Sequence, residues 1–263
     1  MSATHEPIPA LVRVGTLNLR NTSDRWTERY RLIVDQLGPA ILGLQELRRP
    51  SLQRRLLLRG ANLTRPANSS PYHLYPAWKS GIRRFWEGIG VLTELPVERH
   101  HWIALGSERI AQLVRVRLAD GTPLDVFNTH LDHGATSDLL RVRQVERILA
   151  WMRREPDVPQ VLVGDFNARP DSAAIALVTR DLRSAYAERH GDEPASTVPA
   201  PVHRRFGEQG EESVIDFIFV NDRVEVHDAW LTFDHVHPDD DRLSASDHFG
   251  LAATISVRPR NSI

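Results

Sequence analysis

The sequence runs GIGVLT (88–93), VERHHWIAL (97–105), RIAQLVRVRL (109–118) and LDVFNT (124–129) as four strand-like segments with no helix between them. Each segment is rich in the β-branched and apolar residues that favour strands. The Asp-Gly pair at 120–121 is a hairpin turn signal, so the strands on either side of it are expected to be antiparallel neighbours. A doubly wound parallel sheet needs stricter alternation of strands and helices, and the run therefore favours two packed sheets with helices outside.

Strands and helices alternate in the rest of the chain. Before the run, the pattern predicts strands over 12–19 and 40–45, helices over 26–37 and 51–59, and a long surface loop over 60–86. After it, the pattern predicts a helix capped by Ser137 and reaching Met152, a strand over 160–164, a helix over 171–179, a polar loop over 187–212, and strands over 214–220, 224–232 and 251–257.

Composition limits the class of protein. The chain contains no cysteine, which excludes disulfides, cysteine zinc sites and thiol nucleophiles. Its formal net charge is −1, whereas a strong nonspecific nucleic-acid binder is usually more basic. No apolar run approaches the length of a membrane span, and the opening MSATHEPIPALVR lacks the segments of a signal peptide. We expect a cytoplasmic monomer with no transmembrane segment.

Polar residues fall at the ends of the apolar strands, where a rigid backbone meets loops that are open to ligands. The side chains concerned are Asn18, Glu46, Asn128, His130, Asp165, Asn167, Asp216, Asp247 and His248. Taken singly, Asn18 fits a turn residue, Glu46 a solvated carboxylate and His130 a structural hydrogen bonder. Taken together, these residues have the composition of a catalytic site.

The chemistry of this set favours hydrolysis of a phosphate ester. Glu46 and Asp247, with amide oxygens, are hard ligands that suit Mg²⁺ or Mn²⁺. Asp165 and Asn167 are two residues apart and share a face if the segment is extended, which places them to hold a water and an oxyanion. Asp216 lies inside an apolar strand, where a carboxylate is costly unless it is paired, and a histidine is a standard partner. A metal, a water-orienting Asp and a His suit phosphate-ester hydrolysis.

Seven motifs in order carry a family resemblance across nearly the whole chain. They are TLNLR (16–20), LQEL (44–47), EGIGVLTELPV (87–97), FNTHLDH (127–133), GDFNARP (164–170), VIDFIFV (214–220) and SDHFGL (246–251). The sequence resembles the endonuclease/exonuclease/phosphatase superfamily, the fold group of deoxyribonuclease I, abasic-site endonucleases, inositol polyphosphate 5-phosphatases, neutral sphingomyelinases and deadenylases. The resemblance implies a four-layer α/β sandwich with two central, mostly antiparallel β-sheets flanked by helices. It also implies a single domain over residues 1–263, with flexible tails at 1–10 and 259–263.

The resemblance implies a metal site and a catalytic group. Glu46 matches the principal Mg²⁺ ligand of the family, with Asn18 and Asp247 at or near the metal. The matching catalytic side chains are His130, Asp165, Asn167, Asp216 and His248. Asp165 is implied to orient the attacking water, Asn167 to lie near the phosphate oxygens, and Asp216 to pair with His248. His130 is implied to stabilise the phosphate or protonate the leaving group, and the choice of general base between Asp165 and His248 stays open.

Two departures and a basic loop bear on the substrate. Arg20 stands where abasic-site endonucleases carry an Asp, which weakens a DNA-repair function. Glu87 is a candidate partner for His130, and a rim carboxylate is the alternative. In the loop before residue 87, Arg83, Arg84 and Trp86 combine positive charge with an aromatic ring, and we count them as substrate-binding together with Asn128.

The leading hypothesis is a Mg²⁺-dependent phosphoesterase acting on a phosphodiester or phosphomonoester, with Mn²⁺ as an alternative ion. One alternative is a nuclease that acts on DNA or RNA. A second alternative is an inactive binding module that keeps the fold, and the complete set of site residues argues against it.

Overall fold

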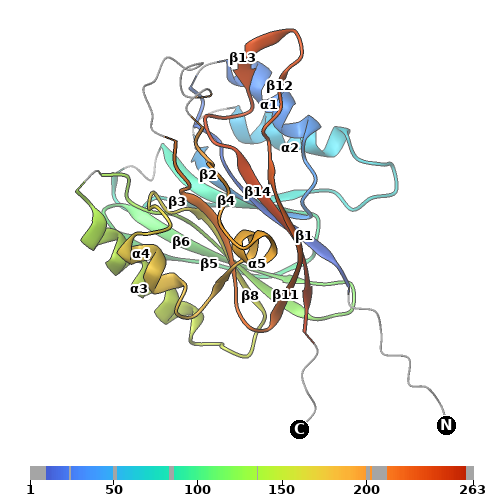
Figure 1. Cartoon of the computed structure of the whole chain (residues 1–263). Coiled ribbons are helices and arrows are strands. Elements are labelled where there is room, and N and C mark those ends of the chain that lie inside the picture. Colours follow the sequence, from blue (N-terminus) through green and yellow to red (C-terminus); the bar gives the residue numbers. More distant parts are fainter. Residues whose placement is uncertain are drawn as a thin grey trace, which may run out of the picture.

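Two six-stranded β-sheets stack face to face in this computed structural model, which describes residues 10–23, 25–49, 52–82, 86–134, 136–199, 202 and 212–258 (Figure 1). The first sheet has the order β11 (Val224–Thr232), β14 (Gly250–Val257), β1 (Val12–Asn18), β2 (Ile41–Arg48), β4 (Glu87–Thr93) and β3 (His73–Trp78). The second has the order β5 (Val97–Gly106), β6 (Arg109–Arg117), β7 (Pro123–His130), β8 (Gln160–Asp165), β10 (Asp216–Val220) and β9 (Arg183–Ser184).

Most neighbouring strands are antiparallel, and each sheet contains one parallel pair. In the first sheet β1 and β2 are parallel and are joined by helix α1 (Trp26–Asp35). In the second sheet β7 and β8 are parallel and are joined by helix α3 (Asp138–Met152). A parallel pair needs such a crossover, whereas the antiparallel β6–β7 pair closes through the Asp-Gly turn predicted from the sequence.

Three apolar clusters separate four layers of structure. The cluster between the sheets contains Val14, Val91, Val126 and Val163. Leu17, Ile33, Leu44 and Leu57 belong to the cluster between the first sheet and the pair α1 and α2 (Gln53–Leu63). Phe127, Ile148, Leu162 and Ile175 belong to the cluster between the second sheet and the pair α3 and α4 (Ala173–Val178). Successive strand residues face opposite sides, so Val126 and Phe127 enter different clusters. The four-layer sandwich expected from the sequence is confirmed.

The prediction of a long surface loop over residues 60–86 is wrong. Helix α2 continues to Leu63, beyond the predicted end at residue 59, and β3 occupies His73–Trp78. Pro76 concealed this strand, because proline lacks the N–H that a central strand needs. Within the described residues β3 lies at the edge of the first sheet and pairs with β4 alone, and a missing donor is tolerated there.

Smaller differences concern helix starts and the terminal segments. The polar loop expected over 187–212 begins inside helix α5 (Ala185–His190). Ser137 precedes α3, but its hydroxyl donates to Asp132 instead of capping the helix. The expected flexible tails lie outside the described residues apart from Ala10. A two-stranded ribbon of β12 (Val236–His237) and β13 (Asp240–Ser244) precedes β14. Across the described segments, no helix is long and apolar enough to cross a membrane.

Candidate active site

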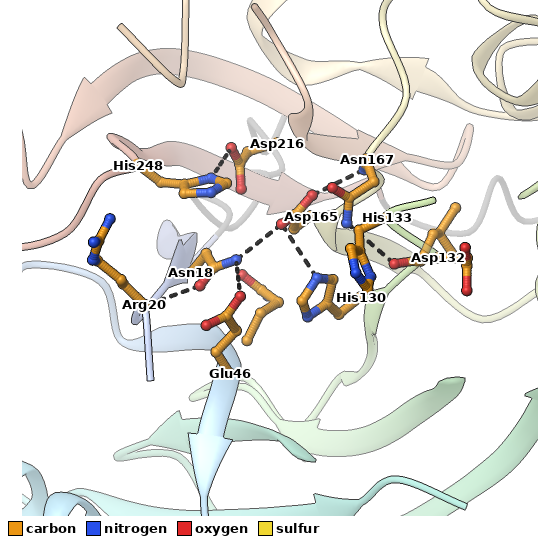
Figure 2. A network of polar contacts seen from close by, with 12 residues as sticks. Asn18, Arg20, Glu46, His130, Asp132, His133, Asp165, Asn167, Asp216 and His248 are labelled. Atoms are coloured by element: carbon orange, nitrogen blue, oxygen red, sulfur yellow. Dashed lines mark hydrogen bonds and ion pairs between the residues drawn. The ribbon is translucent and has the colours of Figure 1, made fainter. Parts of the chain in front are cut away.

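The carboxyl ends of four strands bring polar side chains to one edge, where the two sheets meet (Figure 2). Asn18 ends β1 and Glu46 lies near the end of β2, its parallel neighbour in the first sheet. His130 ends β7 and Asp165 ends β8, and the two residues are register partners in the second sheet. Because the strands of each parallel pair end at the same edge, the pairing itself assembles the site.

Asp165 is the centre of this network. Its Oδ2 accepts a hydrogen bond from Nδ2 of Asn18 at 2.9 Å and lies 3.5 Å from Nε2 of His130. Its Oδ1 accepts the backbone N–H of Asn167 at 2.9 Å. Burial, followed by the negative charge of Asp216, raises the pKa of Asp165 to about 6. The carboxylate is therefore fixed in orientation by groups from both sheets.

Asp216 and His248 form a buried pair beside Asp165. Asp216 begins β10 and is the antiparallel register partner of Asp165. Nδ1 of His248 donates to Oδ2 of Asp216 at 2.8 Å, the hydrogen bond expected from the sequence. Burial opposes a charge on the imidazole, but the Asp216 carboxylate outweighs it and raises the pKa of His248 well above its usual value. The pairing with Asp216 thus favours the protonated imidazole and holds it in one orientation.

Glu46 leaves the regular sheet before it reaches the site. Its φ of 56° is in the left-handed region, which is unfavourable for a residue with a side chain. The pairing of β2 with β4 shifts register between Leu44 and Leu47, and this irregularity contains Glu46. As a result the carboxylate turns toward the network, with Oε1 3.4 Å from Nδ2 of Asn18.

The surroundings of Glu46 fit a hard divalent cation. Burial, followed by the negative charges of Glu87 and Asp247, raises the pKa of Glu46 to about 7. Like-charged oxygens gathered in a partly desolvated site are stabilised by a cation, and carboxylate and amide oxygens are the ligands that Mg²⁺ prefers. Nδ2 of Asn18 donates to the carboxylates of both Glu46 and Asp165, so Asn18 also holds Glu46 next to Asp165.

A second group of possible ligand atoms lies alongside. Asp165, Asp216 and His248 each offer one atom within 4.8 Å of the others. However, Nδ1 of His248 already donates to Asp216, and the raised pKa of His248 favours a positive charge on the ring. That charge opposes a cation, which makes Glu46 the better candidate for a metal ligand.

Asp247 is engaged by an arginine. Its Oδ2 accepts from Nη1 of Arg20 at 3.0 Å, and its Oδ1 accepts from the hydroxyl of Ser246 at 3.0 Å. Burial works against the charged form, but the charges of His248 and Arg20 hold the pKa of Asp247 below its usual value. The departure noted at Arg20 in the sequence therefore supplies a counter-charge to a predicted metal ligand.

Asn167 reaches the site in a different way from that expected. Strand β8 ends at Asp165, and Asn167 has a φ of 47°, so the segment is not extended and the condition for a shared face is not met. Instead, the backbone turns and returns the Asn167 N–H to the Asp165 carboxylate, while its Nδ2 donates to the carbonyl of Leu131 at 3.1 Å. Asn is among the residues that best tolerate this backbone region.

Comparison with known families explains this arrangement. Residues 15–248 match the Endonuclease/Exonuclease/phosphatase family, and this range is most of the chain and contains every residue of the site described above. The chain belongs to this family. The family includes metal-dependent phosphoesterases and nucleases.

Solved structures of the Endonuclease/Exonuclease/phosphatase family share the fold at low sequence identity. A family protein from Bacteroides thetaiotaomicron is 19% identical with a TM-score of 0.77, and the match covers 96% of this chain and 100% of that one. TDP2 from D. rerio, complexed with single strand DNA product, is 17% identical with a TM-score of 0.76. The match covers 94% of this chain and 100% of that one. The human Nocturnin catalytic domain with bound sulfate anion is 20% identical with a TM-score of 0.73. The match covers 95% of this chain and 94% of that one.

One curated relative also matches, over part of its length. Protein angel from Drosophila melanogaster is 34% identical over 87 residues, which are 33% of this chain. This chain spans only 22% of the length of that relative.

Two buried cations near His130 were missed by the sequence analysis. Lys79, 6% exposed, forms an ion pair with Glu87, and Arg109, 4% exposed, donates from Nη2 to Nδ1 of His133 at 2.6 Å. Nη1 of Arg109 is buried and has no hydrogen-bond partner within the described residues. Burial and these two positive charges lower the pKa of His130 well below its usual value. Glu87, a candidate partner for His130, pairs with Lys79 instead.

A buried arginine positions the loops that carry the site in this family member. Arg29 is fully buried on α1, and its Nη1 donates to the carbonyls of Leu19 and Ala245 at 3.0 Å each. The hydroxyl of Ser246 donates to the carbonyl of Asn18 at 2.6 Å. These contacts tie the end of β1 to the segment before β14, which fixes Asn18 relative to His248. An arginine among apolar helix positions was the available sequence signal.

The predicted substrate-binding residues separate into three cases. Asn128 is fully buried between the sheets, where its Nδ2 donates to the carbonyls of Leu44 and Gly90 and its Oδ1 accepts from Gln45. This placement corrects the expectation of a substrate contact. Arg83 and Arg84 lie outside the described residues. Trp86 is 54% exposed and immediately precedes β4.

Proposed function

We propose that this protein is a Mg²⁺-dependent phosphoesterase, with Mn²⁺ as an alternative ion, that hydrolyses a phosphodiester or phosphomonoester bond. The observation that carries the proposal is the convergence of Asn18, Asn167 and His130 on the buried carboxylate of Asp165, with the His248–Asp216 pair alongside. Such a set supplies an oriented water, donors for a phosphoryl group and a proton donor in one place.

Glu46 is the principal metal ligand in this proposal, with Asn18 and Asp247 beside it. A divalent ion bound there supplies positive charge to the phosphoryl oxygens. Because Asp247 already pairs with Arg20, we assign it a supporting contribution.

The remaining side chains divide the proton transfers. Asp165, with a pKa of about 6, is mostly ionised at neutral pH, so it orients the water and accepts its proton. His248 is protonated beside Asp216 and donates to the phosphoryl or leaving-group oxygen. His130 is neutral and suited to a hydrogen bond, and the amide of Asn167 donates to a phosphoryl oxygen that gains charge. Separated pKa values of neighbouring groups support this division of roles.

Nucleic acid is the second candidate substrate class. The D. rerio TDP2 structure contains a single strand DNA product, and this chain has the same fold. A catalytically inactive binding module with this fold is the remaining alternative, and the assay below separates the three.

The test is a hydrolysis assay of the purified chain against a small phosphodiester, a phosphomonoester, DNA, RNA and sphingomyelin. Hydrolysis should stop in excess chelator and return with Mg²⁺ or Mn²⁺. Glu46→Gln should abolish the metal response, whereas Glu225→Gln, an exposed glutamate on β11, should leave it unchanged. Undiminished hydrolysis in excess chelator would refute the proposal, and so would the absence of hydrolysis of every substrate with either ion.

A further inference from the structure

A cavity of about 360 Å³ opens where β3 ends, and Trp102 of β5 also lines it. It is lined by Arg49, Trp78, Lys79, Ser80, Gly81 and Trp102. Its volume falls in the range of about 300–1,000 Å³ that is usual for ligand sites. Nothing in the proposed chemistry uses it.

The strand directions place this cavity at the catalytic edge. β3 runs antiparallel to β4, which runs antiparallel to β2, so β3 ends where Glu46 lies. By the same reasoning β5 runs with β7 and ends on the side of His130. Trp78 is the last residue of β3, and Trp102 lies in the second half of β5.

Lys79 joins the cavity to the catalytic centre. It lines the cavity and forms an ion pair with Glu87, whose charge acts on Glu46. The backbone N–H of Ser80 donates to the carbonyl of Glu108, next to Arg109 and the β5–β6 turn. A ligand in the cavity therefore lies against the same wall that faces His130.

The lining suits a planar aromatic group attached to a phosphate. Half of the Trp102 side chain is exposed (50%), which is unusual for a tryptophan on a strand. The guanidinium carbons of Arg49 and Arg54 lie 5.4 and 5.0 Å from the ring centre of Trp78, so positive charge surrounds the indole faces. Aromatic faces interleaved with arginine are the means by which proteins bind unpaired bases along a phosphate backbone.

We propose that this cavity receives the nucleobase of a nucleotide adjacent to the scissile phosphate of a single-stranded nucleic acid, stacked against Trp102. The inference rests on the proposed phosphoesterase function and deepens it by naming the substrate class. A duplex does not fit, because a base must leave its stack to place a face on an indole. Arg49, Lys79 and Ser80 add polar groups to a lining that contains two indole rings, and this combination favours an aromatic base over a lipid chain.

Binding is measured by fluorescence anisotropy in excess chelator, so that no turnover is needed. The two probes are a short labelled single-stranded DNA and the same strand with abasic sites in place of every base. The variants are Trp102→Ala, Trp102→Phe as the conservative rescue, and Leu139→Ala, an exposed apolar residue on α3, as the matched control. Thermal unfolding checks that each variant is folded.

Wild type should bind the intact strand more tightly than the abasic strand, and Trp102→Ala should remove that difference. The loss for the intact strand should be about fivefold to a hundredfold, with the salt dependence of binding unchanged because no phosphate contact is removed. Trp102→Phe should restore most of the affinity, and Leu139→Ala should have no effect.

Three outcomes overturn the inference. The first is equal affinity of wild type for both strands. The second is a preference for the intact strand that Trp102→Ala retains. The third is binding to sphingomyelin or phosphoinositide vesicles that depends on Trp102, with no binding to DNA. Each leaves chelator-sensitive hydrolysis of a small phosphodiester intact, so failure here is distinguishable from failure of the proposed function.

Discussion

Nδ1 of His248 donates to Oδ2 of Asp216 across 2.8 Å, and this bond joins the second sheet to the segment that leads into the first. Asp216 begins β10 of the second sheet, and His248 precedes β14 of the first. Asp216→Asn keeps the size of the side chain but removes the charge that keeps His248 protonated. Turnover should fall by about 10²–10⁴, the usual value of a positioned acid or base.

The measurement is kcat with the best substrate from the hydrolysis panel, with thermal unfolding to check the fold. Asp239→Asn, in the exposed turn between β12 and β13, serves as the control and should behave as wild type. Wild-type turnover in Asp216→Asn would mean that the pair has a structural role only.

Asn167 offers a way to separate chemistry from backbone strain. Asn167→Asp tolerates the left-handed backbone but loses the amide donor, so kcat should fall by about 10²–10³ with less change in KM. Asn167→Ala should show a similar loss of kcat and, in addition, lower thermal stability, because alanine with a positive φ costs about 1–2 kcal/mol. Asp165→Ala should have the largest loss, since the water is no longer held. Unchanged kcat in all three would contradict the site assignment.

Asn128 should matter for stability and little for chemistry. Its amide joins the two sheets through Leu44, Gly90 and Gln45, and Asn128→Ala leaves these buried groups unpaired. Each unpaired group should cost about 1–3 kcal/mol of unfolding free energy. Denaturant unfolding checks this against Asn68→Ala, an exposed control. A strong loss of activity in folded Asn128→Ala, without a loss of stability, would restore the substrate contact predicted from the sequence.

The loop after β7 should contribute stability that depends on pH. Burial opposes the charge of Asp132, but hydrogen bonds from Ser137, the backbone of Gly134 and Ser107 outweigh it and lower its pKa from 3.8 to about 2. A lowered pKa stabilises the folded state above the unfolded value, and this contribution is lost as pH falls through the folded value. Asp132→Asn should therefore be less stable than wild type at pH 7 and pH 5, and the difference should narrow below about pH 4. Urea unfolding at several pH values checks this; a difference that is constant with pH would contradict it.

The sequence predicted the layers because their signals are local. The Asp-Gly turn and the strand-like run between residues 88 and 129 are readable without knowledge of the fold, and so are the helical spacings of α1 and α3. β3 escaped prediction because the effect of Pro76 depends on whether a strand is at an edge, which only the sheet order decides.

The candidate site was predictable in its residues and less so in its contacts. Asn128 and His130 share a face of β7, and alternation gives them the same direction, but it does not say how far from the edge each one lies. His130 is at the edge of the sheet, whereas Asn128, two residues earlier on β7, lies between the sheets. Arg109 begins β6, which pairs with the His130 strand β7, but Lys79 follows β3 of the other sheet, so the approach of Lys79 to His130 depends on the packing of two sheets.

The single lysine of the chain has a practical consequence. Lys79 carries the only side-chain amine among 263 residues, and it stands in the wall between the catalytic centre and the cavity. Burial and the charge of Arg109 lower its pKa, which increases the fraction of neutral, nucleophilic amine. An acylating reagent therefore meets one lysine, at the place where reagent and substrate compete for entry. The rate at which Lys79 is acylated therefore reports whether the cavity is occupied, and mass spectrometry can measure that rate on the protein without any substitution.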